Sequence, residues 1–165
     1  MCNKFSLVFL LLSVFPDFGT GRAIAETTDT ETVDRGRYLV IITGCNDCHT
    51  PGYRASAGRT PEDLWLTGDT FGWRGPWGTT YGANLRIVLQ GLSEDQWVKY
   101  AQTMTARPPM PWFNLNQTKN EDLRAIYRYI RQLGPVGKPA PAYVPPDEEP
   151  DPPYALFPPP VSSSE

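Results

Sequence analysis

The chain has 165 residues and a formal net charge of −3, with 40% hydrophobic and 20% charged residues. This composition is typical of a globular protein and excludes a coiled coil or a protein with many membrane spans. One His, three Cys and three Met also exclude a multi-histidine zinc enzyme, a four-cysteine zinc site and a disulfide-dense scaffold.

Residues 1–25 have the features of a secretory signal peptide. Lys4 precedes an uncharged, mainly apolar run over residues 5–15, and Ala23-Ile24-Ala25 supplies the small-x-small pattern of a cleavage site. We predict cleavage after Ala25 and a periplasmic location. The run is shorter than the roughly 20 apolar residues of a membrane span, so we expect a membrane association only if the signal stays attached.

The mature chain then divides by charge into two parts. Residues 26–134 carry 12 basic and 12 acidic side chains, whereas residues 135–165 carry one Lys against five acids and hold 11 of the 18 Pro. We therefore predict a neutral domain over 26–134 and an acidic, Pro-rich tail over 135–165 that is extended or disordered.

The first predicted helix covers residues 32–44 and leads directly into Cys45-Asn46-Asp47-Cys48-His49. Cys-x-x-Cys-His is the haem c attachment motif. Two thiols one helical turn apart can each form a thioether to a haem vinyl group, and the histidine that follows becomes the proximal iron ligand. The alternatives are a thioredoxin-like redox pair, half of a zinc site and a plain disulfide. The sequence shows no sheet pattern for the first and no further ligands for the second.

The middle of the chain is predicted as a long loop followed by helices. Residues 51–83 are rich in Gly, Thr and Trp and contain no recognisable periodicity. A short helix or turn is expected over residues 85–92. A longer helix over residues 93–105 is predicted from the Ser93/Gln96 capping box and from apolar residues at helical spacing that include Trp97 and Met104.

Since His49 is the single histidine, the other axial ligand must be sought among sulfurs. Met104 lies on the apolar stripe of its helix, where core packing explains it. Met110 lies between prolines in Arg107-Pro108-Pro109-Met110-Pro111-Trp112. The prolines stiffen this segment and exclude a regular helix, so packing on a helix face does not explain this methionine. We therefore predict Met110 as the distal ligand, with Met104 or an open sixth position as the alternatives.

The last predicted helix covers residues 118–133, and we expect it to begin with a capping box between Thr118 and Glu121. Gly134 and Pro135 end it. In the tail, the apolar groups 142–144 and 154–157 could dock on the domain or on a partner. The acidic residues between them favour a tail in solvent, which is our expectation.

These features together resemble a class I c-type cytochrome. The resemblance rests on Gly36 and Tyr38 before the Cys-x-x-Cys-His motif, on Met110, and on the final helix ending Tyr129-Ile130-Arg131-Gln132-Leu133. Residues 81–85, Met110-Pro111 and residues 121–127 more narrowly resemble haem domains of cytochrome subunits of periplasmic dehydrogenases. The resemblance implies an all-α fold, with three to five helices around one covalent haem and with the first and last helices crossing. It also implies a Pro carbonyl that accepts a hydrogen bond from His49, for which Pro61 is the candidate.

The function expected from these ligands is one-electron transfer. Haem with His49 and Met110 as ligands and Cys45 and Cys48 as thioethers has no vacant site for a substrate. We therefore predict an electron carrier rather than an enzyme, with a dehydrogenase, an oxidase or another cytochrome as redox partner and no nucleic acid. The alternatives are a haem-bearing docking subunit of such a complex and a ligand-binding haem protein. Trp77, Tyr81, Arg74 and Arg86 are candidate partners of the haem propionates, with an exposed side chain in solvent as the favoured alternative for each.

Overall fold

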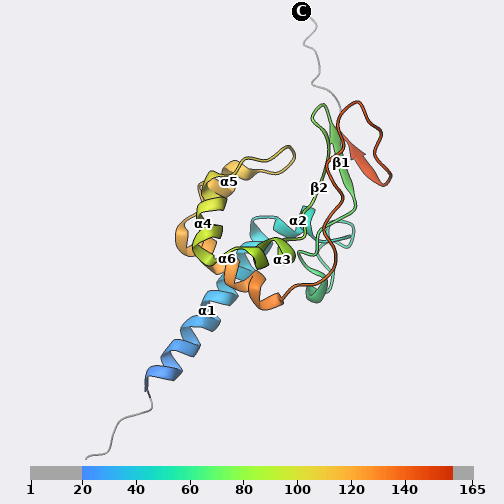
Figure 1. The fold of residues 1–165 in the computed structure, drawn as a ribbon. Helices are drawn as coiled ribbons and strands as arrows, with labels where there is room; N and C mark the ends of the chain where they lie inside the picture. Colours follow the sequence, from blue (N-terminus) through green and yellow to red (C-terminus); the bar gives the residue numbers. More distant parts are fainter. Residues whose placement is uncertain (1–19, 158–165) are drawn as a thin grey trace, which may run out of the picture.

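The computed structural model describes residues 20–157, and their side chains from residue 29 onwards. This part of the chain forms six α-helices, two 3₁₀ helices and three short strands (Figure 1). In chain order they are α1 (Thr20–Ile42), α2 (Cys45–His49), η1 (Glu62–Leu64), β1 (Gly72–Gly75), β2 (Gly78–Tyr81), α3 (Leu85–Val88), η2 (Leu89–Gly91), α4 (Glu94–Thr103), α5 (Trp112–Asn116), α6 (Asn120–Leu133) and β3 (Tyr154–Leu156).

The expected all-α fold is wrong, because the chain combines its helices with a mixed three-stranded sheet. The strand order is β2-β1-β3: β1 and β2 form an antiparallel hairpin with Trp73 opposite Thr80, and β3 runs parallel to β1 with Tyr154 opposite Gly72. Each strand has three or four residues, which is too short for a period of two to be recognised in the sequence. The hairpin therefore falls within residues 51–83, which were predicted as a loop.

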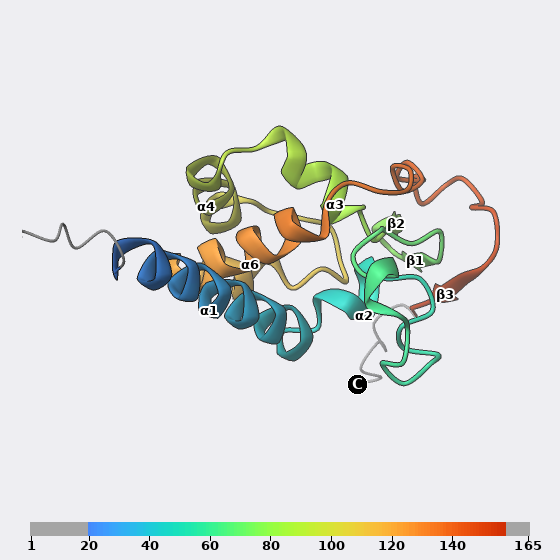
Figure 2. The same ribbon diagram turned by 90° about the horizontal axis from the view of Figure 1, so that it is seen from below.

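The helical part is built on close packing between α1 and α6 (Figure 2). A Cβ atom on Gly36 of α1 would lie 2.0 Å from the carbonyl oxygen of Ala125 in α6, so glycine is what permits this approach of two backbones. From α4, the buried Trp97 donates its indole N–H to the carbonyl of Leu123 at 2.8 Å. The buried apolar core comprises Leu39, Val40, Trp65, Leu66, Leu89, Trp97, Val98, Ala101, Leu123, Ala125, Ile126, Tyr129 and Ile130.

The predicted helix ends are confirmed in part. The capping box of α4 is present, with Ser93 accepting from the backbone of Gln96 and the Gln96 side chain accepting from that of Ser93. The predicted capping box of α6 is wrong: the helix begins at Asn120, and the Thr118 hydroxyl instead donates to the carbonyl of Asn114 in α5. Helix α5 was not predicted, and it ends at Asn116, four residues before α6 begins at Asn120.

The C-terminal extension, defined here as residues 135–157, lies along the hairpin instead of standing free in solvent. Val144 and Thr79 exchange two backbone hydrogen bonds of 2.7 and 3.1 Å, and β3 pairs with the outer edge of β1. The two apolar groups noted in the sequence are the parts that make these contacts, so the expectation of a solvated tail does not hold for this segment. Residues 158–165 of the predicted tail lie outside the described residues.

The predicted signal peptide falls mostly on residues 1–19, which lie outside the described residues. Helix α1 begins at Thr20 and so runs across the predicted cleavage point after Ala25. Among residues 20–157, no helix combines the length and the apolar character needed to cross a bilayer.

Candidate functional site

The motif Cys45–His49 forms a short helix of its own, α2. Gly44 separates it from α1 with a positive φ of 71°, a conformation that glycine adopts without strain. Cys45 and Cys48 are free and half-buried, one helical turn apart. Burial raises the pKa of both thiols, so both are protonated in the neutral range.

The imidazole of His49 is held by a backbone carbonyl. Its Nδ1 lies 2.7 Å from the carbonyl oxygen of Ala83. Because a carbonyl oxygen only accepts hydrogen bonds, Nδ1 carries the proton and Nε2 keeps its lone pair. Burial lowers the pKa of His49, which favours this neutral form. A histidine with one nitrogen bound to a carbonyl is the usual form of a metal-ligating imidazole.

The carbonyl that holds His49 is not the one that the resemblance implied. Pro61 was the candidate, but its carbonyl accepts from the backbone of Leu64 in the turn that opens η1. Ala83 follows Gly82, whose missing side chain lets the segment approach α2: a Cβ atom there would lie 1.7 Å from the carbonyl oxygen of Cys48. A backbone carbonyl carries no signature in the sequence, so Ala83 was missed.

Neighbouring loops fix the backbone of α2 from two further sides. Gly68 donates its N–H to the carbonyl of His49 at 2.8 Å. Thr50 is buried, donates to the side chain of Asn46 at 2.7 Å and accepts from the backbone of Leu66 at 2.8 Å. The motif is therefore anchored on a rigid frame, as a site that must hold a group in fixed geometry requires.

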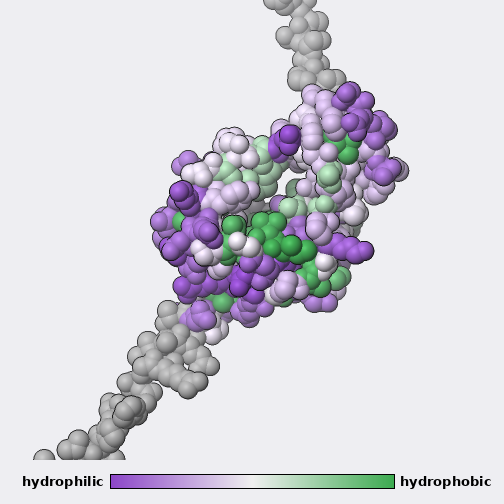
Figure 3. All heavy atoms as spheres, viewed as in Figure 1, coloured by the Kyte–Doolittle hydropathy of each residue, from purple (hydrophilic) through white to green (hydrophobic). Residues whose placement is uncertain are grey.

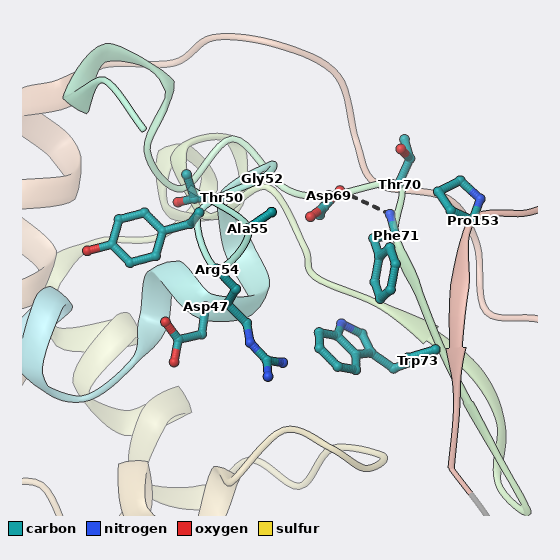
Figure 4. A pocket seen from close by; sticks show the side chains of 12 residues that line it. Asp47, Thr50, Gly52, Arg54, Ala55, Asp69, Thr70, Phe71, Trp73 and Pro153 are labelled. Carbon is teal, nitrogen blue, oxygen red and sulfur yellow. Dashed lines mark hydrogen bonds between the residues drawn. The ribbon is translucent and has the colours of Figure 1, made fainter. Parts of the chain in front are cut away.

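A cavity of about 620 Å³ opens beside α2 (Figure 4). It is lined by α2 and the loop after it, by residues 69–73 leading into β1, and by the extension: Asp47, Thr50, Gly52, Tyr53, Arg54, Ala55, Asp69, Thr70, Phe71, Trp73, Pro153 and Ala155. Arg54 and Trp73 face each other there, with the guanidinium 5.2 Å from the ring centroid. The buried indole nitrogen of Trp73 has no hydrogen-bond partner.

An unpartnered buried N–H beside an arginine fits an anionic group, because both are donors and nothing in the described chain accepts from the indole. Haem carries two carboxylates on an apolar ring. Phe71 and Trp73 provide apolar walls, and Trp73 and Arg54 provide donors for a carboxylate. This wall of the cavity fits the carboxylate-bearing edge of a haem, and Cys45, Cys48, His49 and Met110 are not among the residues that line the cavity. A group of three or more His, Cys, Asp or Glu side chains that could hold a bare metal ion does not occur among the described residues.

Three of the four sequence-predicted propionate partners are used inside the protein. Arg74 donates to the carbonyl of Glu148 at 2.7 Å and pairs with the Glu149 carboxylate at 3.3 Å. The buried Arg86 donates to the carbonyls of Asp63, Leu133 and Gly134. Trp77 donates its indole N–H to the carbonyl of Trp73. Tyr81 is half-buried, and burial raises the pKa of its hydroxyl.

The two candidate sulfur ligands lie at opposite ends of one segment. Met104 is half-buried directly after α4, and its carbonyl accepts from the Asn116 side chain at 3.3 Å. Met110 is half-buried directly before Pro111 and α5. Figure 3 shows the molecule hollowed between this segment and the β1–β2 hairpin. The structure thus brings Cys45, Cys48 and His49 together on α2 and carries Met110 on a separate segment.

The chain matches no protein-family model, no curated protein and no solved structure.

Proposed function

We propose that the chain is a monohaem c-type cytochrome that carries one electron. In this proposal Cys45 and Cys48 bind the haem covalently, His49 is the proximal ligand and Met110 is the distal ligand. The observation that carries the proposal is the geometry of α2: two free thiols one turn apart are followed by an imidazole whose Nδ1 is hydrogen-bonded to the Ala83 carbonyl.

In this proposal the residues of the site have separate roles in attaching, orienting and binding the haem. Each thiol adds its sulfur and its hydrogen across one vinyl double bond, so two thioethers form and no atom is lost. The Ala83 carbonyl holds the His49 ring in orientation and keeps the proton on Nδ1. The Trp73 N–H and Arg54 would donate to propionate oxygens. When bound, the haem supplies the reversible iron(II)/iron(III) couple, which a Met ligand shifts to higher potential.

The predicted signal peptide supports a periplasmic location, where the redox partners would be a dehydrogenase, an oxidase or another cytochrome. The cofactor, the location and the partners are parts of the same proposal.

The test is expression of the full chain together with a haem c maturation system. We expect intact-mass measurement to give the mature chain, cleaved after Ala25, plus one haem that survives denaturation. Cys45→Ala and Cys48→Ala should each leave one thioether, and the double variant should lose covalent haem. A full chain that leaves the maturation system with no covalent haem would overturn the proposal.

The distal ligand is tested by carbon monoxide. The reduced wild-type protein should bind carbon monoxide slowly, because Met110 has to leave first. Met110→Ala should bind it rapidly, and Met104→Ala, the matched control, should behave as wild type. Rapid stoichiometric binding by the untreated protein would instead favour a ligand-binding haem protein with an open sixth position.

A further inference from the structure

The segment that carries Met110 takes part in few hydrogen bonds at its tip. We call residues 105–111 the distal loop. Pro108 and Pro109 have no N–H and lie in a turn, and the N–H groups of residues 105–107 make no backbone–backbone hydrogen bond within the described chain. Two contacts link the tip to other segments: the Thr80 hydroxyl donates to the carbonyl of Pro108 at 2.8 Å, and the Arg107 guanidinium lies 3.8 Å from the ring centroid of Tyr143.

Tyr143 belongs to the C-terminal extension, so the extension contributes one of these two contacts. Its ring also packs against Gly78, where a Cβ atom would lie 2.8 Å from Tyr143 Cε2, and its hydroxyl donates to the Trp77 carbonyl at 2.8 Å. The next residue, Val144, forms the two-hydrogen-bond bridge to Thr79. Tyr143 is thus fixed to the hairpin on one side and offers a ring to Arg107 on the other.

The same extension is attached close to the proximal ligand. The buried Asn84 donates its side-chain N–H groups to the carbonyls of Val136 and Lys138 at 2.8 and 3.2 Å. Asn84 directly follows Ala83, the residue that holds His49. From this anchor the chain runs along the hairpin to Tyr143 and then to β3 (Figure 1). One continuous segment therefore connects the proximal side of the candidate site with the distal loop.

We propose that Tyr143 is a positioning residue, which holds the distal loop through Arg107 so that Met110 stays in place as the axial ligand. The inference rests on the proposed function, in which Met110 binds iron. A cation above an aromatic face is attracted by the ring quadrupole, and the attraction remains when the phenol is replaced by phenylalanine. Without an aromatic ring at position 143 the tip loses this contact and keeps the Thr80–Pro108 hydrogen bond. The state in which Met110 is detached from iron then becomes more populated.

The experiment compares single variants of the full-length haem-loaded protein. Tyr143→Leu removes the aromatic face, Arg107→Gln removes the cation, and Tyr143→Phe keeps the ring. Tyr154→Phe is the matched control, because Tyr154 lies on the same extension but bonds to Glu149. Three quantities are measured. They are the rate of carbon monoxide binding to the reduced protein, the charge-transfer band between the Met110 sulfur and iron in the oxidised protein, and hydrogen exchange of a peptide spanning residues 105–113.

We expect Tyr143→Leu and Arg107→Gln to raise the carbon monoxide rate by about fivefold, which is what one exposed cation–π contact can supply. Both should weaken the charge-transfer band and speed exchange in the distal loop. Tyr143→Phe should stay near wild type, as should Tyr154→Phe. The double variant of Tyr143→Leu with Arg107→Gln should be no faster than either single variant, because both remove the same contact.

Unchanged rates and unchanged exchange in Tyr143→Leu would overturn the positioning role while leaving the cytochrome proposal intact. A carbon monoxide rate in wild type equal to that of Met110→Ala would overturn Met110 as ligand and the positioning role with it. Absence of covalent haem by intact mass would overturn the proposed function. Hydrogen exchange of the haem-free chain would then report whether Tyr143 restrains the distal loop at all.

Discussion

Replacing Gly82 by alanine should separate the two segments that define the proximal side of the site. The added Cβ atom would lie 1.7 Å from the carbonyl oxygen of Cys48, whereas real Cβ contacts are essentially never under 3.0 Å. The segments must therefore move apart by at least 1.3 Å, the difference between these two distances. The colliding atom is backbone, so no side-chain rotation relieves the clash.

The cost follows from what lies beside Gly82. A shift of this size along the His49–Ala83 bond would lengthen it from 2.7 Å beyond hydrogen-bonding distance and leave Nδ1 unpaired. Overpacking costs about 1–3 kcal/mol, and a buried donor without a partner costs about 1–3 kcal/mol. We expect a loss of roughly 2–6 kcal/mol in the free energy of unfolding, a large part of the roughly 5–15 kcal/mol of an ordinary domain.

The assay is urea unfolding at pH 7 of the haem-free and haem-loaded proteins, followed by tryptophan fluorescence and circular dichroism. Gly91→Ala is the matched control, because a Cβ atom at Gly91 would meet nothing within 4 Å, and it should stay within about 0.5 kcal/mol of wild type. If Gly82→Ala loses less than about 1 kcal/mol, the close approach of the two backbones does not carry the energy assigned to it.

Three further changes test the frame around the site. Glu62→Gln should lower stability by about 1 kcal/mol at pH 7, since Glu62 pairs with Arg37 at 2.9 Å and accepts from the buried Tyr129 hydroxyl. The hydrogen bond from Arg37 lowers the pKa of Glu62 below 4.5. The contribution of Glu62 to stability is therefore present above that pH and is lost as the pH falls through the folded-state pKa. Urea titrations at several pH values should show the stabilities of the wild type and Glu62→Gln converging in acid. Trp97→Phe should cost about 1–3 kcal/mol in thermal unfolding, because the Leu123 carbonyl loses its indole donor and a void opens; an unchanged Tm would contradict this. Arg86→Lys should lower the Tm and speed hydrogen exchange at the end of α6, because an ammonium group cannot span three carbonyls as the planar guanidinium does; equal exchange rates would show that these bonds do not hold that helix end.

The parts that sequence reasoning predicted are those in which local chemistry decides the structure. Helix α4 has an apolar face and a capping box within thirteen residues of chain, and both are found in the structure. The Thr118 cap of α6 failed because a neighbouring turn, α5, competed for the same hydroxyl. In the structure this hydroxyl is therefore not the N-cap of α6.

The parts that were missed depend on contacts between distant residues. The four-residue strand β1 is rich in glycine and is completed by β3, about eighty residues further along the chain. Ala83 acts through its backbone, which every residue type has, and no composition or spacing indicates it. Trp73 lies in the segment predicted as a loop, and only the structure shows that its indole nitrogen lacks a hydrogen-bond partner.

The parallel pairing of β3 with β1 gives the last described segment of the chain a protective role, because it covers the outer edge of the hairpin. Pro153 and Ala155 of the same segment also line the cavity beside α2. A chain shortened at Gly134 would retain Cys45–His49 and Met110 but expose an unpaired sheet edge, which invites association between chains. Recombinant forms meant to report on the pocket should therefore extend at least to residue 157.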